Sequence, residues 1–227
     1  MMKATKWTVL AAAAVLGLSS TAMADTVTAT QPGESWPADQ TFAGRARGMS
    51  QGNWELAVGQ LPGQAGQFDS TDYNWVDGQE TSWSFSYDGA KTASFTLGDA
   101  ATSWTLDNRY EIDAIYLRPQ NYEDGKVNLT GVNLDGTKVL FDGSTDELSV
   151  VDGHQLWQID PVNPGAFNLS GQVTFTGDAA GQWASESSKV DVIASGHVVP
   201  VPAAAWGGLA LLGTLGGARL IRRRREA

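Results

Sequence analysis

The sequence predicts an all-β domain between Asp25 and Val198, an antiparallel β-sandwich of the jelly-roll or immunoglobulin-like type. Three observations predict it. Apolar and polar residues alternate in about nine or ten short segments, as half-buried strands require. Six Asp-Gly pairs separate these segments and favour tight hairpin turns. No segment between them keeps an apolar period of 3.6 residues for three turns, so we expect no amphipathic helix in this domain.

The first 24 residues, 1–24, are typical of a secretory signal peptide. Lys3 and Lys6 form a basic start, an apolar run follows, and residues 22–24 are a small-x-small cleavage site. The apolar run is too short to span a bilayer. We therefore expect a mature chain that begins at Asp25 and is exported through the inner membrane.

The mature chain is expected to begin with an irregular leader, residues 25–52, because no alternation is clear there. A strand at 54–58 and a polar loop at 59–74 follow. The clearest hairpin is 81–97, where aromatic and aliphatic residues occupy one face and hydroxyl residues the other. Further strands are expected at 103–106, 112–117, 126–134, 138–141, 155–159, 167–176 and 189–194.

Charge and cysteine content restrict the class of protein. Residues 25–198 hold 24 Asp and Glu against 8 Lys and Arg, a net charge of −16. Such a surface repels nucleic acid and anionic lipid, so nucleic-acid binding is excluded. The chain has no cysteine, so its stability outside the cell must come from packing or bound ions and not from disulfides.

The last 29 residues, 199–227, predict how the chain is sorted. A short motif precedes an apolar segment, 204–221, which as a helix would cross most of a bilayer. The motif consists of Val199, Pro200, Val201, Pro202 and Ala203. The basic cluster at 219–225 consists of Arg219, Arg222, Arg223, Arg224 and Arg225. By the positive-inside rule this cluster is cytoplasmic, which leaves the domain outside the inner membrane.

This tripartite tail resembles the PEP-CTERM class of sorting signals, and its motif is similar to the VPLPA variant with Val201 in place of Leu. The resemblance implies processing by an integral-membrane cysteine protease or transpeptidase of the exosortase type, in Gram-negative bacteria that make exopolysaccharide. An uncut membrane anchor is the alternative. Residues 53–56, 74–78 and 82–96 also resemble exported "choice-of-anchor" β domains, which implies surface display and nothing catalytic.

Two kinds of binding site are predicted from residue types. Asp69, Asp72, Asn74 and Asp77 place four hard oxygen ligands in one loop, which favours Ca²⁺, with turn chemistry as the alternative. Trp75 and Trp183 lie in polar loops and are candidates for an exposed platform on which a sugar ring stacks. The tryptophans on strand alternations are expected in the core instead: Trp54, Trp83 and Trp104.

No catalytic site is predicted. Glycoside hydrolysis needs two carboxylates at a defined separation, and Glu111 with Asp113 would share a strand face. Two further pairs are Glu123 with Asp124 and Asp146 with Glu147. Acidic residues are so frequent here that such pairs are expected by chance. His154 follows a turn and His197 lies in the predicted stalk beside the motif, and neither has triad or metal-ligand spacing.

The sequence therefore predicts an exported β-sandwich, anchored or processed at its C-terminus, that acts as a non-catalytic component of the cell surface or extracellular matrix. The expected partners are an exosortase-type enzyme and the inner membrane. A carbohydrate-binding module that engages the exopolysaccharide is the alternative, and a secreted polysaccharide hydrolase comes third. The ligand, the final covalent state of the C-terminus and the oligomeric state are left open.

Overall fold

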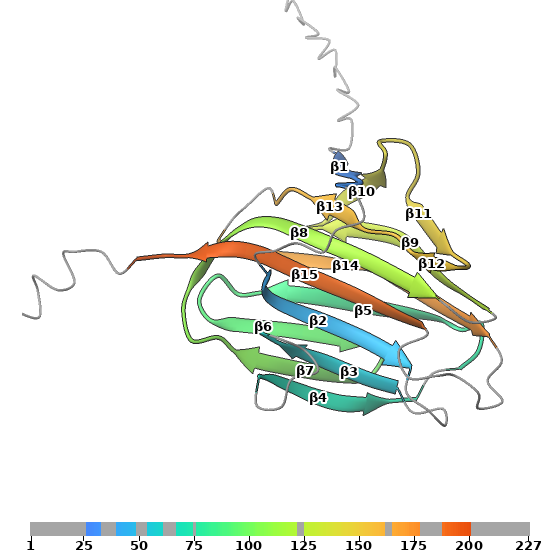
Figure 1. Ribbon diagram of the computed structural model, residues 1–227, viewed down its shortest axis with the longest axis horizontal. Coiled ribbons are helices and arrows are strands. Elements are labelled where there is room, and N and C mark those ends of the chain that lie inside the picture. Colours follow the sequence, from blue (N-terminus) through green and yellow to red (C-terminus); the bar gives the residue numbers. More distant parts are fainter. Residues whose placement is uncertain are drawn as a thin grey trace, which may run out of the picture.

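The computed structural model describes residues 26–32, 40–48, 54–60, 67–74, 76–121, 125–161, 165–177 and 188–200. Within these residues the fold consists of β-strands and contains no helix, so the all-β prediction is confirmed (Figure 1). None of the described segments forms a helix long and apolar enough to cross a membrane. The predicted signal peptide, the predicted span at 204–221 and the basic cluster lie outside the described residues, as does the motif from Val201 onward.

Fifteen strands follow one another along the described chain. They are β1 (Thr26–Thr30), β2 (Gln40–Gly48), β3 (Trp54–Gly59), β4 (Phe68–Tyr73), β5 (Glu80–Tyr87), β6 (Thr92–Leu97), β7 (Ala100–Thr105), β8 (Tyr110–Asn121), β9 (Gly125–Leu134), β10 (Thr137–Phe141), β11 (Glu147–Val150), β12 (Gly153–His154), β13 (Trp157–Ile159), β14 (Phe167–Gly177) and β15 (Ser188–Val198).

All of these strands belong to one sheet, with the order β4-β3-β2-β15-β8-β13-β1-β10-β9-β14-β5-β6-β7. β11 pairs with β9, and β12 pairs with β8. Each pairing is antiparallel except that of β1 with β10. The sheet curls until β2 and β15 face β5 and β14, and the two end strands, β4 and β7, lie along the same side of the molecule (Figure 1).

The prediction of two separate sheets is not confirmed, because the sheet is continuous and nearly closed. β1 is the reason. It pairs with β13 through Ala29 and Thr30 and with β10 through residues 26–29, so it joins the two halves at a place where a sandwich would leave two open edges. Parallel pairing with β10 depends on residues more than a hundred positions away, which local alternation cannot indicate.

Two predicted irregular segments contain strands. The expected leader, 25–52, holds β1 and β2, and β2 lies inside the sheet between β3 and β15. Its inward-facing side chains are Phe42 and Ala46 with Gly44 between them, so small residues weaken its apolar pattern. The expected polar loop, 59–74, holds β4, a largely polar end strand whose one partner among the described strands is β3.

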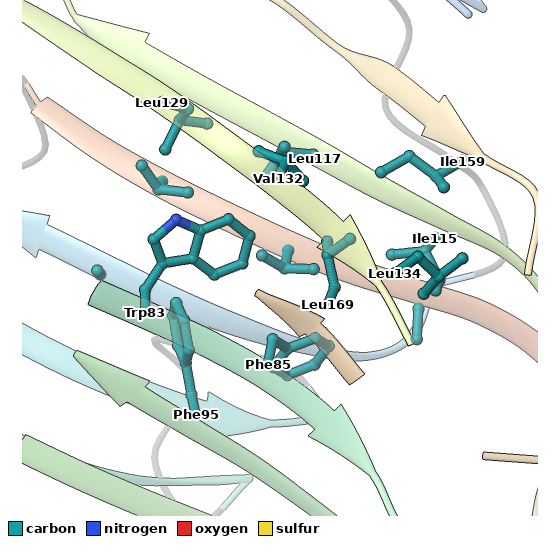
Figure 2. Close-up of a cluster of buried hydrophobic side chains, with 14 of the residues drawn as sticks. Trp83, Phe85, Phe95, Ile115, Leu117, Leu129, Val132, Leu134, Ile159 and Leu169 are labelled. Atoms are coloured by element: carbon teal, nitrogen blue, oxygen red, sulfur yellow. The ribbon is translucent and has the colours of Figure 1, made fainter. Parts of the chain in front are cut away.

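The core fills the space inside the curled sheet. Figure 2 shows Trp83 and Phe85 from β5, with Phe95 from β6, among leucines and isoleucines that come from β8, β9, β13 and β14. The ring of Phe42 on β2 lies 5.9 Å from Phe85 and 5.2 Å from Tyr87, centroid to centroid, in tilted contacts. These contacts across the interior hold the two halves of the sheet together.

Five of the six Asp-Gly pairs mark strand ends as predicted, and Asp124 of the sixth lies outside the described residues. The glycines of all six pairs have positive φ. At Asp135-Gly136, between β9 and β10, both residues do, with φ of 52° and 82°, as the commonest two-residue hairpin turn requires. At the β5–β6 turn the Asp88 carboxylate accepts backbone hydrogen bonds from Ala90, Lys91 and Thr92 at 2.8, 2.9 and 2.9 Å. The hairpin predicted at 81–97 is therefore confirmed.

β15 is buried on both faces near its start, because a charged network covers its outer side. Asp191 is 1% exposed, and its two carboxylate oxygens lie 2.6 Å from the Arg45 and Arg118 guanidinium groups. Burial would raise the pKa of Asp191, but the charges of Arg45 and Arg118 outweigh it, and the pKa lies below its ordinary value. The network ties β2, β15 and β8 together across the sheet.

Candidate functional site

A groove of about 820 Å³ opens where the two ends of the sheet meet. We call it the seam groove, and residues 71–74, 79–82 and 98–101 line it. These segments are the end of β4, the start of β5 and the turn from β6 to β7. Among the described strands β4 pairs with β3 alone and β7 with β6 alone, so the groove exists because the sheet curls without closing.

One wall of the seam groove is built around Tyr73. Its ring packs against the core, and its hydroxyl donates a hydrogen bond of 3.1 Å to Thr81 Oγ1, which joins β4 to β5. Gly98 has φ of +57°, and a Cβ there would lie 3.2 Å from Thr81 Cγ2 and 3.4 Å from the Tyr73 ring. Glycine therefore permits the turn and leaves room beside the ring.

The lining of the seam groove is polar and acidic. Three carboxylates come from three different segments: Asp72 from β4, Glu80 from β5 and Asp99 from the β6–β7 turn. Among the described residues that line the groove there is no Lys, Arg or His. Amides and hydroxyls make up most of the remaining polar groups. The groove can therefore accept many hydrogen bonds from a hydroxyl-rich or cationic ligand.

The four residues of the predicted Ca²⁺ site do not come together as expected. Asp72 and Asn74 line the seam groove, but Asp69 is three residues from Asp72 on one strand, so their side chains point to opposite faces. The Asp77 carboxylate accepts a 3.0 Å hydrogen bond from the Gly177 amide. Within the described segments no group of three or more His, Asp or Glu side chains could hold a metal. Calcium binding stays a prediction.

The predicted sugar platform lies outside the described residues, because both Trp75 and Trp183 do. Trp75 is the next residue after Asn74, which lines the seam groove. Of the tryptophans expected in the core, Trp83 is buried at 3% exposure and Trp104 packs partly buried against the core, as predicted.

A second polar cluster joins the start of β8 to the end of β15. Glu111 and Asp113 share a face, as predicted, and His197 lies against both of them. His197 Nδ1 is 3.1 Å from Asp113 Oδ2, and Nε2 is 3.5 Å from Glu111 Oε2. The hydrogen bond and charge of Asp113, with a smaller effect of Glu111, raise the pKa of His197. The expectation that His197 lies in a stalk is wrong, because β15 continues to Val198.

The cluster depends on an irregularity in strand pairing that no sequence pattern predicts. The register of β15 against β8 shifts between Ser195 and Gly196, so Asp113 has no direct partner on β15. A side chain at Gly196 would collide with the Glu111 carbonyl oxygen, so glycine is needed there. The Thr41 hydroxyl bonds both the amide and the carbonyl of Gly196 at 3.0 Å. This arrangement turns His197 toward the two carboxylates.

The remaining predicted carboxylate pairs do not form a site in the described residues. Asp146 Oδ2 pairs with Lys138 Nζ at 2.7 Å on the surface, and Glu147 is exposed at the start of β11. Glu123 and Asp124 lie outside the described residues, and His154 is exposed on β12.

Sequence reasoning missed most of the seam groove. Tyr73, Glu80 and Asp99 belong to three short segments whose convergence follows from the curl of the sheet, and no motif links them. The one local signal is Gly98-Asp99 between two alternating segments, which marks a turn without showing what it faces.

No protein-family model matches this chain, and no curated protein matches it significantly.

Proposed function

We propose that this protein is an exported, non-catalytic component of the bacterial cell surface or extracellular matrix, sorted by its C-terminal tail. The observation that supports the proposal is the sequence of the two ends, with a signal peptide at 1–24 and a tripartite tail at 199–227. The position of β15 agrees with it, because the last strand ends at Val198 and the motif begins at the next residue. A strand paired on both sides would hold the folded domain directly beside the processing site.

The test is protease treatment of intact producing cells, followed by detection of the domain. Surface display predicts that external protease removes the wild-type protein from cells. A variant that lacks residues 199–227 should instead appear in the soluble exported fraction. A wild-type protein that stays protected from external protease and is found in the cytoplasm would contradict the proposal.

A carbohydrate-binding module is the second candidate, and the seam groove favours it. The groove has a volume of about 820 Å³, which is within the range of small-molecule sites. Its lining offers carboxylates, amides, hydroxyls and the Tyr73 ring, which are groups that bind sugars in proteins. Trp75 follows Asn74 directly in the chain. A polysaccharide hydrolase would use the same groove, with two carboxylates about 5–10 Å apart across the scissile bond.

Affinity electrophoresis of the mature protein in gels that contain the exopolysaccharide of the producing cells tests this second candidate. Retardation that is lost in Y73A would assign binding to the seam groove. Retardation that is kept in Y73A and lost when Trp75 and Trp183 are both replaced by Ala would assign it to the predicted tryptophan platform. Release of new reducing ends from the polysaccharide by the wild type, and not by E80Q, would favour the hydrolase.

We also infer that the domain is a β-sandwich in the broad sense, because β2 packs face to face on β5 across the core. An experimental structure tests this class. Two layers of strands that pack face to face on a core filled by side chains would support it, whereas a round barrel cross-section would contradict it.

A further inference from the structure

We infer that residues 196–199 form a docking segment, and that its release from the start of β8 controls how readily the tail is processed. The inference rests on the proposed sorting by the C-terminal tail and concerns the regulation of that processing. Three features support it: the pairing of the segment on one side, a backbone contact of the first motif residue and the contacts of His197 with two carboxylates.

The docking segment lies where β15 loses one of its two neighbours. β2 pairs with β15 from Lys189 as far as Ser195, whereas β8 pairs with it as far as Val198. The side chains of His197 and Val198 are exposed, in contrast to the buried first half of the strand. A strand end with one neighbour and little buried apolar surface opens locally at a low cost in free energy. The docking segment can therefore leave β8 while the rest of the domain stays folded.

The docking segment includes the first residue of the motif. The Val199 amide donates a 3.0 Å hydrogen bond to the Arg109 carbonyl oxygen, which extends the pairing with β8 one residue beyond Val198. At the other end of the segment, the Thr41 hydroxyl bonds both the amide and the carbonyl of Gly196. An enzyme that binds the motif as an extended chain uses its backbone hydrogen-bonding groups. The docked form therefore withholds Val199 from the processing enzyme.

His197 makes the docking dependent on charge. Its Nδ1 is 3.1 Å from Asp113 Oδ2 and its Nε2 is 3.5 Å from Glu111 Oε2, so the protonated ring, with a donor on each nitrogen, holds the segment most strongly. Arg109, just before β8, is the next charged residue on this side of the strand, and β2 begins here with neutral residues. The two carboxylates raise the pKa of His197. The docked fraction is therefore greatest below pH 6.5 and falls as the pH rises through the folded pKa.

Hydrogen exchange of the full chain in detergent micelles tests the docking itself. The Val199 amide should be protected in the wild type, with a protection factor that falls between about pH 6 and pH 8. E111Q/D113N should lower this factor by about twofold to fivefold at the lower pH, the range for exposed ion pairs, and should remove its pH dependence. E147Q/D152N removes the same charge from exposed sites elsewhere and should match the wild type. An unprotected Val199 amide in the wild type, or equal protection in E111Q/D113N, would overturn the inference and leave the sorting proposal standing.

Pulse labelling of producing cells tests whether docking limits processing. E111Q/D113N should lose the tail about twofold to fivefold faster than the wild type, and E147Q/D152N should lose it at the wild-type rate. Positions 111 and 197 are directly paired, so a disulfide in E111C/H197C would hold the segment docked. That variant should be processed more slowly when oxidised than after reduction.

Equal processing rates for E111Q/D113N and the wild type, or for the oxidised and reduced forms of E111C/H197C, would overturn the inference and leave the sorting proposal standing. A tail that is retained in every protein, the wild type included, would overturn the inference together with the proposed processing.

Discussion

Asp191 shows at the residue scale how an acidic domain uses its few basic residues. Half of the eight Lys and Arg between residues 25 and 198 lie on the outer face of β2, β15 and β8, where Arg45 and Arg118 hold the Asp191 carboxylate. A buried carboxylate is costly to leave unpaired, so these contacts stabilise the centre of the sheet. The basic residues that make them are therefore not available for binding polyanions.

The substitution D191N should lower the free energy of unfolding by about 3–5 kcal/mol at pH 7, because two guanidinium groups then lose their buried partner. The pKa of Asp191 is lowered in the folded state, so this stabilisation is present above the unfolded pKa, near 3.8, and is lost as the pH falls through the folded pKa. Urea unfolding at pH 7 and near pH 3 measures it. D146N, which breaks the exposed pair with Lys138, is the control and should change little. Coincident curves for D191N and the wild type at pH 7 would contradict the account.

His197 has a pKa raised above its ordinary value of 6.5, mainly by the hydrogen bond and charge of Asp113. Its contribution to stability is therefore complete below pH 6.5 and is lost as the pH rises through the folded pKa. An NMR titration of the imidazole should show a pKa above 6.5 in the wild type and a larger decrease in D113N than in E111Q. A His197 pKa that is the same in all three proteins would show that the cluster does not form in solution.

At the scale of the elements, local pattern predicted the strands whose apolar and polar residues alternate clearly. The β5–β6 hairpin was predicted from alternation and Asp88-Gly89, and the β9–β10 turn from Asp135-Gly136. β1, β2, β4, β11 and β12 were missed, and the first three were missed for different reasons. β1 is held by distant partners, β2 has glycine and alanine at inward positions, and β4 is a polar end strand. The seam groove was missed for the same reason as β1. Pairing between strands distant in sequence and the curl of the sheet bring its residues together.

Gly44 is where β2 meets the β5–β6 hairpin, and its lack of a side chain sets the distance between them. A Cβ there would lie 2.7 Å from Phe85 Cδ2 and 2.8 Å from Phe95 Cδ1, which is overpacked. We expect G44A to lower the free energy of unfolding by about 1–3 kcal/mol. In G44A/F85L the loss should be smaller than the sum of the two single losses, because Leu leaves room for the methyl group. Additive losses in chemical denaturation would show that the two positions are not in contact.

At the scale of the whole molecule, the seam groove and the end of β15 are two different parts of the fold. The curl of the sheet brings β4 beside β5 and the β6–β7 turn to form the seam groove, whereas β15 runs to Val198 and presents the chain end that leads into the tail. The backbone amide of Val199 still donates a 3.0 Å hydrogen bond to the Arg109 carbonyl oxygen, so the first motif residue is docked on the domain. We infer that ligand binding and sorting use separate parts of the fold.

The central claim is that both ends of the chain are signals for export and sorting, and the mass of the intact protein from the producing cells tests it most directly. The account predicts a polypeptide that begins at Asp25 and ends within residues 199–203, with any added mass on its last residue. Recovery of the full chain from Met1 to Ala227 in the cytoplasmic fraction would contradict it.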